Sequence, residues 1–501
     1  MVLGATLLMT GSAWAATTSY SVTSLGVNTP VVVGVDTGDN TIYAVNKNGT
    51  TVSIFRNGGL VGTAGVGADV NSIAVNSVTH TAYIVGESTN NVTIIRGDAA
   101  VADVGVGNSP KGVAVDDTTG IAYIASYDSN SASVIQEATP GTFTATTVPT
   151  GSNPVAVAVD TSTHIAYVVN KNSTTVSEIQ GTAVVRTVGV NADPNAIAVD
   201  STTHTAYVVN NTSENVSVIV GTAGVGQDVP VGANPVAVAV DSSTHIAYVV
   251  NKNSTQVSEI QGTAVVRTVG VNADPVAVAV DSTTHTAFVV NNASENVSAI
   301  QGDAAIAQDV PVGVDSRDVA VNPTNATAVV ANLGSNTVSV ISQNISPTIT
   351  SGSPPAAKVG EPYTFTFQAV GTPTPVITVT GALPDGLTYD PATATISGTP
   401  TAVPASPATI VITASNGADP SATAQYSLGV SPASSPPTPT ETPTPTNITS
   451  QQGSASGTGA HLASTGSDVL LPVLGALTIV AAGTSAILLA ARARRVAKLR
   501  R

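Results

Sequence analysis

Short runs of alternating apolar and polar residues recur along most of the chain in a constant order. Val157-Ala-Val-Asp160 is followed by Ala166-Tyr-Val-Val-Asn170 and then by Val176-Ser-Glu-Ile179, and near copies return from Val238 onward. Such alternation is typical of short strands whose two faces differ in burial. The residues that close the first phrase stand roughly 40 to 44 positions apart, the period of a four-stranded propeller blade: Asp36, Asn76, Asp116, Asp160, Asp200, Asp241, Asp281 and Asn322.

The order of the strands also predicts how the ring closes. Eight three-strand phrases are present, and a weaker fourth-strand segment precedes each of them. The first such segment, Tyr20 to Val27, stands ahead of the first phrase, and none follows the last phrase, Val338 to Ile341. We expect these two segments to pair, because an open edge would leave backbone donors and acceptors unpaired. Eight units favour an eight-bladed ring, and a seven-bladed ring with one unit docked outside is the alternative.

Composition agrees with an all-β fold and excludes two kinds of site. The chain has no cysteine, so it can form neither a disulfide nor a thiolate metal site. Its 31 acidic residues outnumber 16 basic ones, and six of the basic residues lie in the last ten positions. The remainder is therefore strongly acidic, and we expect no nucleic-acid partner.

The first residues, 1–16, have the form of a secretory signal that is truncated at its start. An apolar run from Val2 to Met9 precedes Ala13-Trp-Ala15, which has the small-x-small form of a cleavage site. The alternative is a buried N-terminal strand.

The second phrase of each unit carries a family resemblance. Tyr167-Val-Val-Asn170, Tyr207-Val-Val-Asn210 and Tyr248-Val-Val-Asn251 are each followed by a Val-Ser-x-Ile strand. Over residues 17–343 the chain resembles the YVTN family of β-propeller repeats, and this resemblance implies the propeller fold. It implies little about activity, because that family mixes surface-layer proteins with enzyme-like relatives.

Residues 346–432 differ in composition from the repeat, with more proline and aromatic residues. Leu383-Pro-Asp-Gly-Leu387 and Ile396-Ser-Gly-Thr-Pro400 resemble the Ig-like domains of bacterial surface proteins, which implies one small β-sandwich. That resemblance would allow a Ca²⁺ site at Asp385, Asp390 and Asp419. The alternative is that these aspartates cap turns.

The C-terminal part predicts attachment to a cell wall. Residues 433–461 are rich in Pro, Thr, Ser and Gly and predict a disordered, extended linker. An apolar run at 469–491 is long enough for one transmembrane helix, and the basic tail at 492–501 predicts a cytoplasmic end. Between them lies a pentapeptide at 462–466 that resembles a sortase sorting signal of the variant with Ala at its second position: Leu462, Ala463, Ser464, Thr465 and Gly466.

The sorting resemblance implies that a sortase cysteine attacks the Thr465 carbonyl and releases Gly466 with the span. Thr465 is then joined to an amine of the peptidoglycan, after the helix has held the protein in the membrane. The alternative is a permanent single-pass anchor in which the pentapeptide has no role.

Catalytic residues are not evident in the repeats. Five histidines occupy one turn in five units, and equivalent positions in a ring lie too far apart to share a substrate or metal: His80, His164, His204, His245 and His285. We interpret them as polar turn residues in contact with solvent. Glu178 and Glu259 are interpreted as outward or half-exposed residues of a third strand, so we expect no catalytic residue, metal or cofactor.

Ligand binding is expected where loops meet near the ring axis on one face. The loops between fourth and first strands supply Asx residues there, and the alternative is that turns require them: Asp69, Asn108, Asn153, Asp193, Asn234, Asp274 and Asp315. Lys111 and Arg317 interrupt the pattern and are the first candidates for ligand contacts.

The segments together predict a non-catalytic, extracellular protein that is covalently attached to the cell wall and displays a propeller as a binding or adhesion module. Its partners would be sortase, peptidoglycan and an unknown glycan or protein. Two alternatives are a wall-bound propeller enzyme of lactonase or lyase type and a structural envelope protein that forms an array.

Overall fold

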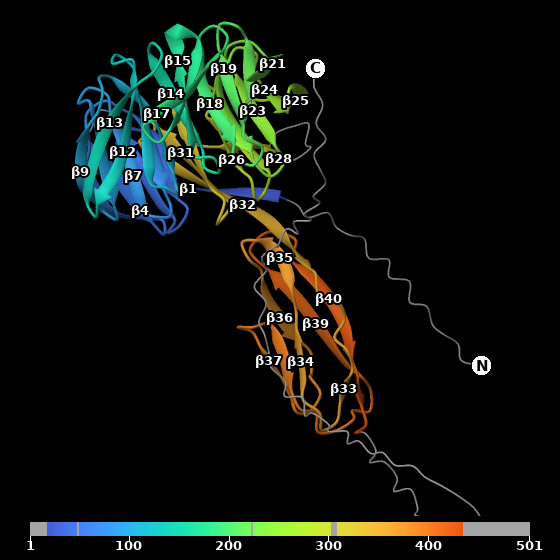
Figure 1. Cartoon of the computed structure of the whole chain (residues 1–501). Helices are drawn as coiled ribbons and strands as arrows, with labels where there is room; N and C mark the ends of the chain where they lie inside the picture. The colour runs from blue at the N-terminus through green and yellow to red at the C-terminus, as the bar shows by residue number, and fades with distance from the viewer. Residues whose placement is uncertain (1–17, 48–49, 222–223, 302–307, 434–501) are drawn as a thin grey trace, which may run out of the picture. The chain divides into compact units, whose positions relative to one another are not determined.

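The structure, a computed structural model, describes residues 18–47, 50–221, 224–301 and 308–433 (Figure 1). The signal sequence expected at 1–16, the linker from 434 onward, the sorting pentapeptide, the membrane span and the basic tail lie outside the described residues. Within the described ranges, no helix is long and apolar enough to span a bilayer. These ranges consist mainly of β-strands and connecting loops, with a 3-10 turn at Lys171–Ser173, so the expected all-β fold is confirmed.

Repeated four-stranded antiparallel sheets build most of the chain, and each follows its strands in sequence order. The first three sheets contain β2 (Pro30–Asp36), β3 (Thr41–Asn46), β4 (Thr51–Arg56), β5 (Gly59–Gly65), β6 (Val70–Asn76), β7 (Thr81–Gly86), β8 (Asn91–Arg96), β9 (Ala99–Gly105), β10 (Pro110–Asp116), β11 (Ile121–Ser126), β12 (Ser131–Thr139) and β13 (Thr142–Pro149). The next four contain β14 (Pro154–Asp160), β15 (Ile165–Asn170), β16 (Thr175–Gln180), β17 (Ala183–Gly189), β18 (Pro194–Asp200), β19 (Thr205–Asn210), β20 (Asn215–Val220), β21 (Val225–Pro230), β22 (Pro235–Asp241), β23 (Ile246–Asn251), β24 (Gln256–Gln261), β25 (Ala264–Gly270), β26 (Pro275–Asp281), β27 (Thr286–Asn291), β28 (Asn296–Gln301) and β29 (Gln308–Pro311).

The last sheet of the repeat is completed by the first strand of the chain. Its order is β1-β32-β31-β30, formed by β1 (Thr18–Gly26), β32 (Thr337–Ile349), β31 (Thr327–Asn332) and β30 (Ser316–Asn322). In the ladder of β1 with β32, Val22 lies opposite Ile341 and Leu25 lies opposite Val338. The predicted pairing of the N-terminal segment with the last phrase is therefore confirmed.

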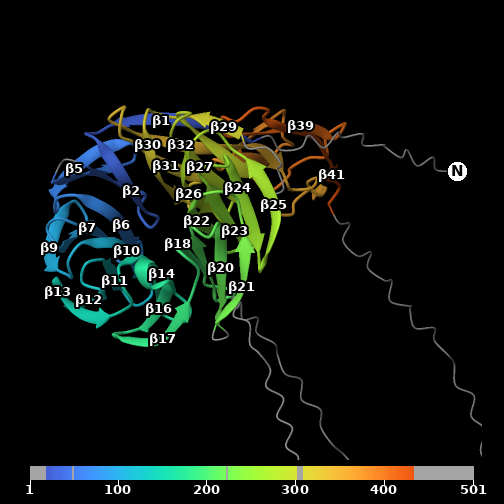
Figure 2. The ribbon, with the colours of Figure 1, turned by 90° about the horizontal axis from the view of Figure 1, so that it is seen from above.

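The first strands of the sheets surround a common centre (Figure 2). Each contacts the first strand of the following sheet, from β2 with β6 through to β26 with β30, and β30 contacts β2. Sheets arranged in this way form a closed ring, as the repeat predicted.

The hydrophobic core lies between neighbouring sheets because each sheet has two covered faces. Tyr167 and Val169 of β15 pack in one cluster with Ala206 and Val208 of β19 in the next sheet. The second strands are therefore buried along most of their length, and in β15 only Ile165 is partly exposed. Val169, at the third position of the Tyr-Val-Val-Asn phrase, is fully buried.

The segment after the ring forms a small β-sandwich. One sheet has the order β34-β38-β37 and the other β36-β39-β40, while β33 pairs in parallel with β41 and β35 pairs with the C-terminal end of β32. Phe367, Ile396 and Ile410 lie in the core between these sheets. The strands are β33 (Ala357–Lys358), β34 (Tyr363–Thr366), β35 (Ala369–Thr372), β36 (Val376–Thr380), β37 (Leu387–Asp390), β38 (Thr395–Gly398), β39 (Ala408–Ser415), β40 (Ala422–Leu428) and β41 (Val430–Ser431).

The closing strand generates a stability prediction. Leu25 is buried against Val33, Phe55 and Val338, whereas Val22 on the same strand is 39% exposed. We expect Leu25→Ala to lower the free energy of unfolding by about 2–4 kcal/mol, because it leaves a cavity at the joint between the first and last sheets. Val22→Ala, the control, should cost less than about 1 kcal/mol. Equal effects in denaturant unfolding would contradict the packing of β1 at this joint.

Candidate functional site

The Asx residues of the predicted binding face lie in tight turns just before the first strands. Six of them have positive φ, between 53° and 59°, a conformation that Asn and Asp tolerate better than other side chains: Asp69, Asn153, Asp193, Asn234, Asp274 and Asp315. In the third sheet the residue with this conformation is Ser109, with φ 51°. The assignment of Asn108 to the repeated position is therefore wrong by one residue. Backbone geometry alone accounts for much of the Asx pattern.

Several of these side chains are held by the loop of the preceding sheet. The ammonium group of Lys171 lies 3.1 Å from the Asp193 carboxylate, and that of Lys252 lies 3.0 Å from the Asp274 carboxylate. Within one sheet, the Nδ2 of Asn172 donates to Oδ1 of Asn153 over 2.8 Å. The two lysine contacts tie adjacent sheets together at this face.

Two of the predicted ligand-binding residues line one cavity. Asp69 and Arg317 contribute to a cavity of about 280 Å³ together with Lys47 and Asn71, and its remaining walls are apolar: Val31, Val32, Val70 and Leu333. Arg317 also forms an ion pair with Asp315, with 2.7 Å between Nη2 and Oδ1. The cavity therefore presents cationic and amide donors beside aliphatic surface.

Lys111, the other predicted contact residue, is not among the residues that line this cavity. Its Nζ pairs with the Glu87 carboxylate and lies 5.9 Å from the centre of the Tyr127 ring. Burial would raise the pKa of Glu87, but hydrogen bonds from Lys111, Asn71 and Ser109 outweigh it and lower that pKa. Lys111 and Arg317 thus occupy different environments on this face.

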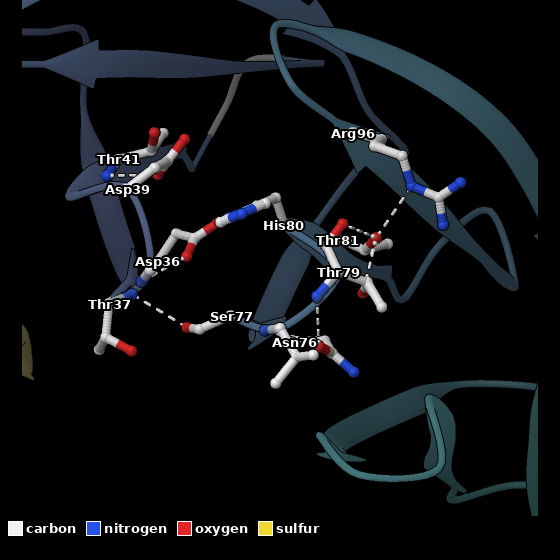
Figure 3. Close-up of polar contacts among 12 residues, drawn as sticks. Asp36, Thr37, Asp39, Thr41, Asn76, Ser77, Thr79, His80, Thr81 and Arg96 are labelled. Carbon is white, nitrogen blue, oxygen red and sulfur yellow. Dashed lines mark hydrogen bonds and ion pairs between the residues drawn. The ribbon is translucent and has the colours of Figure 1, made fainter. Parts of the chain in front are cut away.

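The opposite ends of the first strands carry a repeated pair of side chains that sequence reasoning missed. Nδ1 of each of the five histidines lies 2.8–3.0 Å from a carboxylate oxygen of the aspartate that closes the first strand of the preceding sheet. Figure 3 shows the first of these pairs, in which the His80 ring faces the Asp36 carboxylate. The Asp–His pairs are Asp36–His80, Asp116–His164, Asp160–His204, Asp200–His245 and Asp241–His285.

Each pair places a buried carboxylate among several donors. Oδ1 of Asp160 accepts hydrogen bonds from the backbone N–H of Ser162 over 3.0 Å and from its hydroxyl over 2.5 Å, and the Oδ2 faces His204. Burial alone would raise the pKa of Asp160, but hydrogen bonds from Ser162, His204 and Thr163 outweigh it and lower that pKa. The ionised Asp160 carboxylate therefore stabilises the fold at pH values above the ordinary pKa of aspartate. This contribution is lost as the pH falls through the lowered pKa of the folded protein.

The interpretation of the histidines as separate turn residues in contact with solvent is confirmed, because their side chains are 44–47% exposed and do not converge on a common centre. It missed that each histidine also joins two sheets. A sequence signal for this role exists at two of the three joints without histidine: where the turn has Gly120 or Asn40, the preceding first strand ends in Asn76 or Asn322. At the third joint the turn has Ala326, and the preceding first strand keeps Asp281.

The interpretation of Glu178 and Glu259 as outward or half-exposed is wrong. Both are buried, with 4% and 1% exposed, and each pairs with an arginine of the neighbouring strand. Arg186 binds the Glu178 carboxylate, and Nη2 of Arg267 lies 2.7 Å from the Glu259 carboxylate. The arginines lie across the strand pair, so each carboxylate is neutralised within its own sheet.

A group of potential metal ligands gathers at the first Asp–His pair. One ligand atom each from Asp36, Asp39 and His80 lie within 4.8 Å of one another, and this is the one such group in the described ranges. Nη2 of Arg56 already lies 3.4 Å from the Asp39 carboxylate, so a cation would compete with the guanidinium.

The aspartates considered for Ca²⁺ do not belong to that group. Asp390 accepts hydrogen bonds from the Ala392 N–H over 3.0 Å and from the Thr393 hydroxyl over 2.8 Å, which is the geometry of a turn cap.

Comparison with known families supports the Ig-like domain. Residues 338–431 match the family described as "Putative Ig domain". No curated protein matches the chain. Among solved structures, hydrazine synthase of Kuenenia stuttgartiensis is 16% identical with a TM-score of 0.44, over 63% of this chain and 96% of that chain.

Virginiamycin B lyase from Staphylococcus aureus is 10% identical with a TM-score of 0.45, over 65% of this chain and 99% of that chain. A functionally unknown protein from Desulfotomaculum acetoxidans is 14% identical with a TM-score of 0.44, over 54% of this chain and 95% of that chain. At these scores the likenesses carry no argument about fold or activity.

The Asp–His pairs can be tested against a joint of the same chain that naturally lacks such a pair. His204→Gly removes the imidazole and keeps a residue that adopts the local φ of 55° without strain. We expect it to lower the free energy of unfolding by about 1–3 kcal/mol, because the buried Asp160 carboxylate loses a donor. The double variant Asp160→Asn/His204→Gly reproduces the natural Asn76–Gly120 pair and should recover part of that loss. A double variant that is less stable than His204→Gly would contradict the role of the pair.

Proposed function

We propose that this protein is displayed outside the cell and that its propeller, counted as eight blades of the YVTN type, acts as a non-catalytic binding or adhesion module. The Ig-like domain and the Pro/Thr-rich segment would separate the module from the envelope. A sortase would join Thr465 to peptidoglycan after the apolar segment at 469–491 had held the chain in the membrane. The order of segments in the sequence supports this proposal.

The observation that carries the binding role is the cavity lined by Asp69 and Arg317. It combines two cationic side chains, Lys47 and Arg317, with the Asp69 carboxylate, an amide and aliphatic walls. Such a lining suits a ligand that has an anionic or hydroxyl-rich group on an apolar frame, as a sugar acid of a surface glycan has.

The Asp–His pairs give further support. In the described ranges each of the five histidines is already engaged with a buried aspartate at a joint between sheets. An acid–base role for these imidazoles would require breaking contacts that connect the ring.

The binding role predicts that substitutions of Arg317 and Lys111 differ in their effect on ligand binding. Arg317→Ala should weaken binding of the full chain to an array of surface glycans at least tenfold, because it removes a charged donor from the cavity. Lys111→Ala removes the same charge outside the cavity and should leave binding unchanged. If the protein bound no glycan or surface protein but hydrolysed a lactone, the enzyme alternative would replace this proposal.

The anchoring role predicts a change of cell fraction. Thr465→Ala should move the protein from the wall fraction, released by muralytic digestion, to the membrane fraction, because sortase joins the wall to the carbonyl of this residue. Ser464→Ala, at the variable position of the pentapeptide, is the control and should stay in the wall. A wild-type protein found entirely in the membrane would favour the permanent anchor.

A further inference from the structure

One joint between sheets lacks an Asp–His pair and contains a cavity. The cavity has a volume of about 410 Å³ and lies between the sheet β6–β9 and the sheet β10–β13. The residues that line it include Tyr83, Arg96, Asp117, Gly120, Gln136 and Glu137.

The cavity occupies the place where other joints hold an imidazole. Gly120 stands at the turn position that is histidine in five other sheets, and it has the same left-handed conformation, with φ 72°. A Cβ built on Gly120 would meet no atom within 4 Å, so the space beside it is open. Its counterpart in the preceding sheet is Asn76, whose Oδ1 accepts hydrogen bonds from the backbone N–H groups of Val78 and Thr79.

The charges in the cavity are unevenly compensated. Arg96 and Glu137 form a two-point ion pair, with distances of 3.0 and 2.9 Å, and so neutralise each other. Asp117 has no such partner: its Oδ1 is buried and makes no hydrogen bond to any described residue. Burial, with Asp116 and Asp36 nearby, raises the pKa of Asp117 to about 6. The site therefore holds a desolvated carboxylate in a negative environment.

We propose that this cavity binds a compact organic cation, with a guanidinium or ammonium group against Asp117 and a short apolar body against Tyr83 and Ile121. A cation would restore the interaction that the carboxylate has lost with water, which an anion or a neutral group would not do. The volume suits a small molecule or the end of one long side chain. This site lies apart from the cavity of Arg317 and does not depend on the proposed function.

The affinity should follow the ionisation of Asp117. Because the pKa of this carboxyl is raised to about 6 in the free protein, it is charged at pH 7.5 and mostly neutral at pH 5. Binding of a cation should therefore weaken as the pH falls through 6. The other ionisable groups around it are Asp36 and Asp116, their partners His80 and His164, and Arg96, Glu137 and Tyr83 of the lining.

The test is calorimetric titration of the full chain with ethylguanidinium, compared with its neutral isostere ethylurea. At pH 7.5 we expect saturable binding of ethylguanidinium in the millimolar range and at least tenfold weaker binding of ethylurea. Asp117→Asn should weaken binding of ethylguanidinium at least tenfold, and Gly120→His should abolish binding because its side chain fills the cavity. Asp385→Asn removes an exposed carboxylate of the sandwich and is the control for net charge.

Three results would overturn the proposal. These are no saturable binding, equal affinity for the neutral isostere, and an Asp117→Asn variant that binds as the wild type does. A thermal melt of each variant checks folding. If Gly120→His failed to fold, Asp117→Asn and the isostere would still decide the question.

Discussion

Closure of the ring is the constraint on which the rest of the structure depends. The sheets are close copies of one another, and each buries its faces against two neighbours. The joint between the last and first sheets is made by segments from opposite ends of the repeat. There the β1–β32 ladder is reinforced by the backbone N–H of Val33, which donates to Oδ2 of Asp318 over 3.0 Å, and by Asn322, whose Nδ2 donates to Oδ1 of Asn40 over 2.7 Å. Closing so long a loop costs entropy, and these contacts offset that cost.

The same geometry explains why the polar side chains are distributed as they are. At the joints a first strand ends against the turn of the next sheet, so a residue type repeated in most units meets one partner type at most joints. Asp and His satisfy each other at five joints, while Asn322 meets Asn40 at the closing joint. The two cavities proposed as binding sites lie where the repetition fails. The cavity of Arg317 lies beside the closing joint, and the cavity of Asp117 lies at the joint where Gly120 replaces histidine.

Much of this architecture could be predicted from the sequence. The period, the order of strands, the pairing of the N-terminal segment and the Ig-like domain follow from alternation, turn residues and motif spacing. Burial of Glu178 could not be read from alternation, because both faces of a sheet inside the ring are covered. Its signal was the partner: Arg186 lies opposite Glu178 across the strand pair. Likewise, the cavities depend on side-chain packing between sheets, which the period does not report.

Native-state hydrogen exchange of β1 and β32 tests the closed ring most directly. The account predicts that the amides of their shared ladder are protected as strongly as those of β15 and β16 inside the ring, because closure makes the ends part of the same cooperative structure. Rapid exchange of β1 and of the outer edge of β32, with the inner sheets still protected, would show a ring that opens at its joint and would contradict the account.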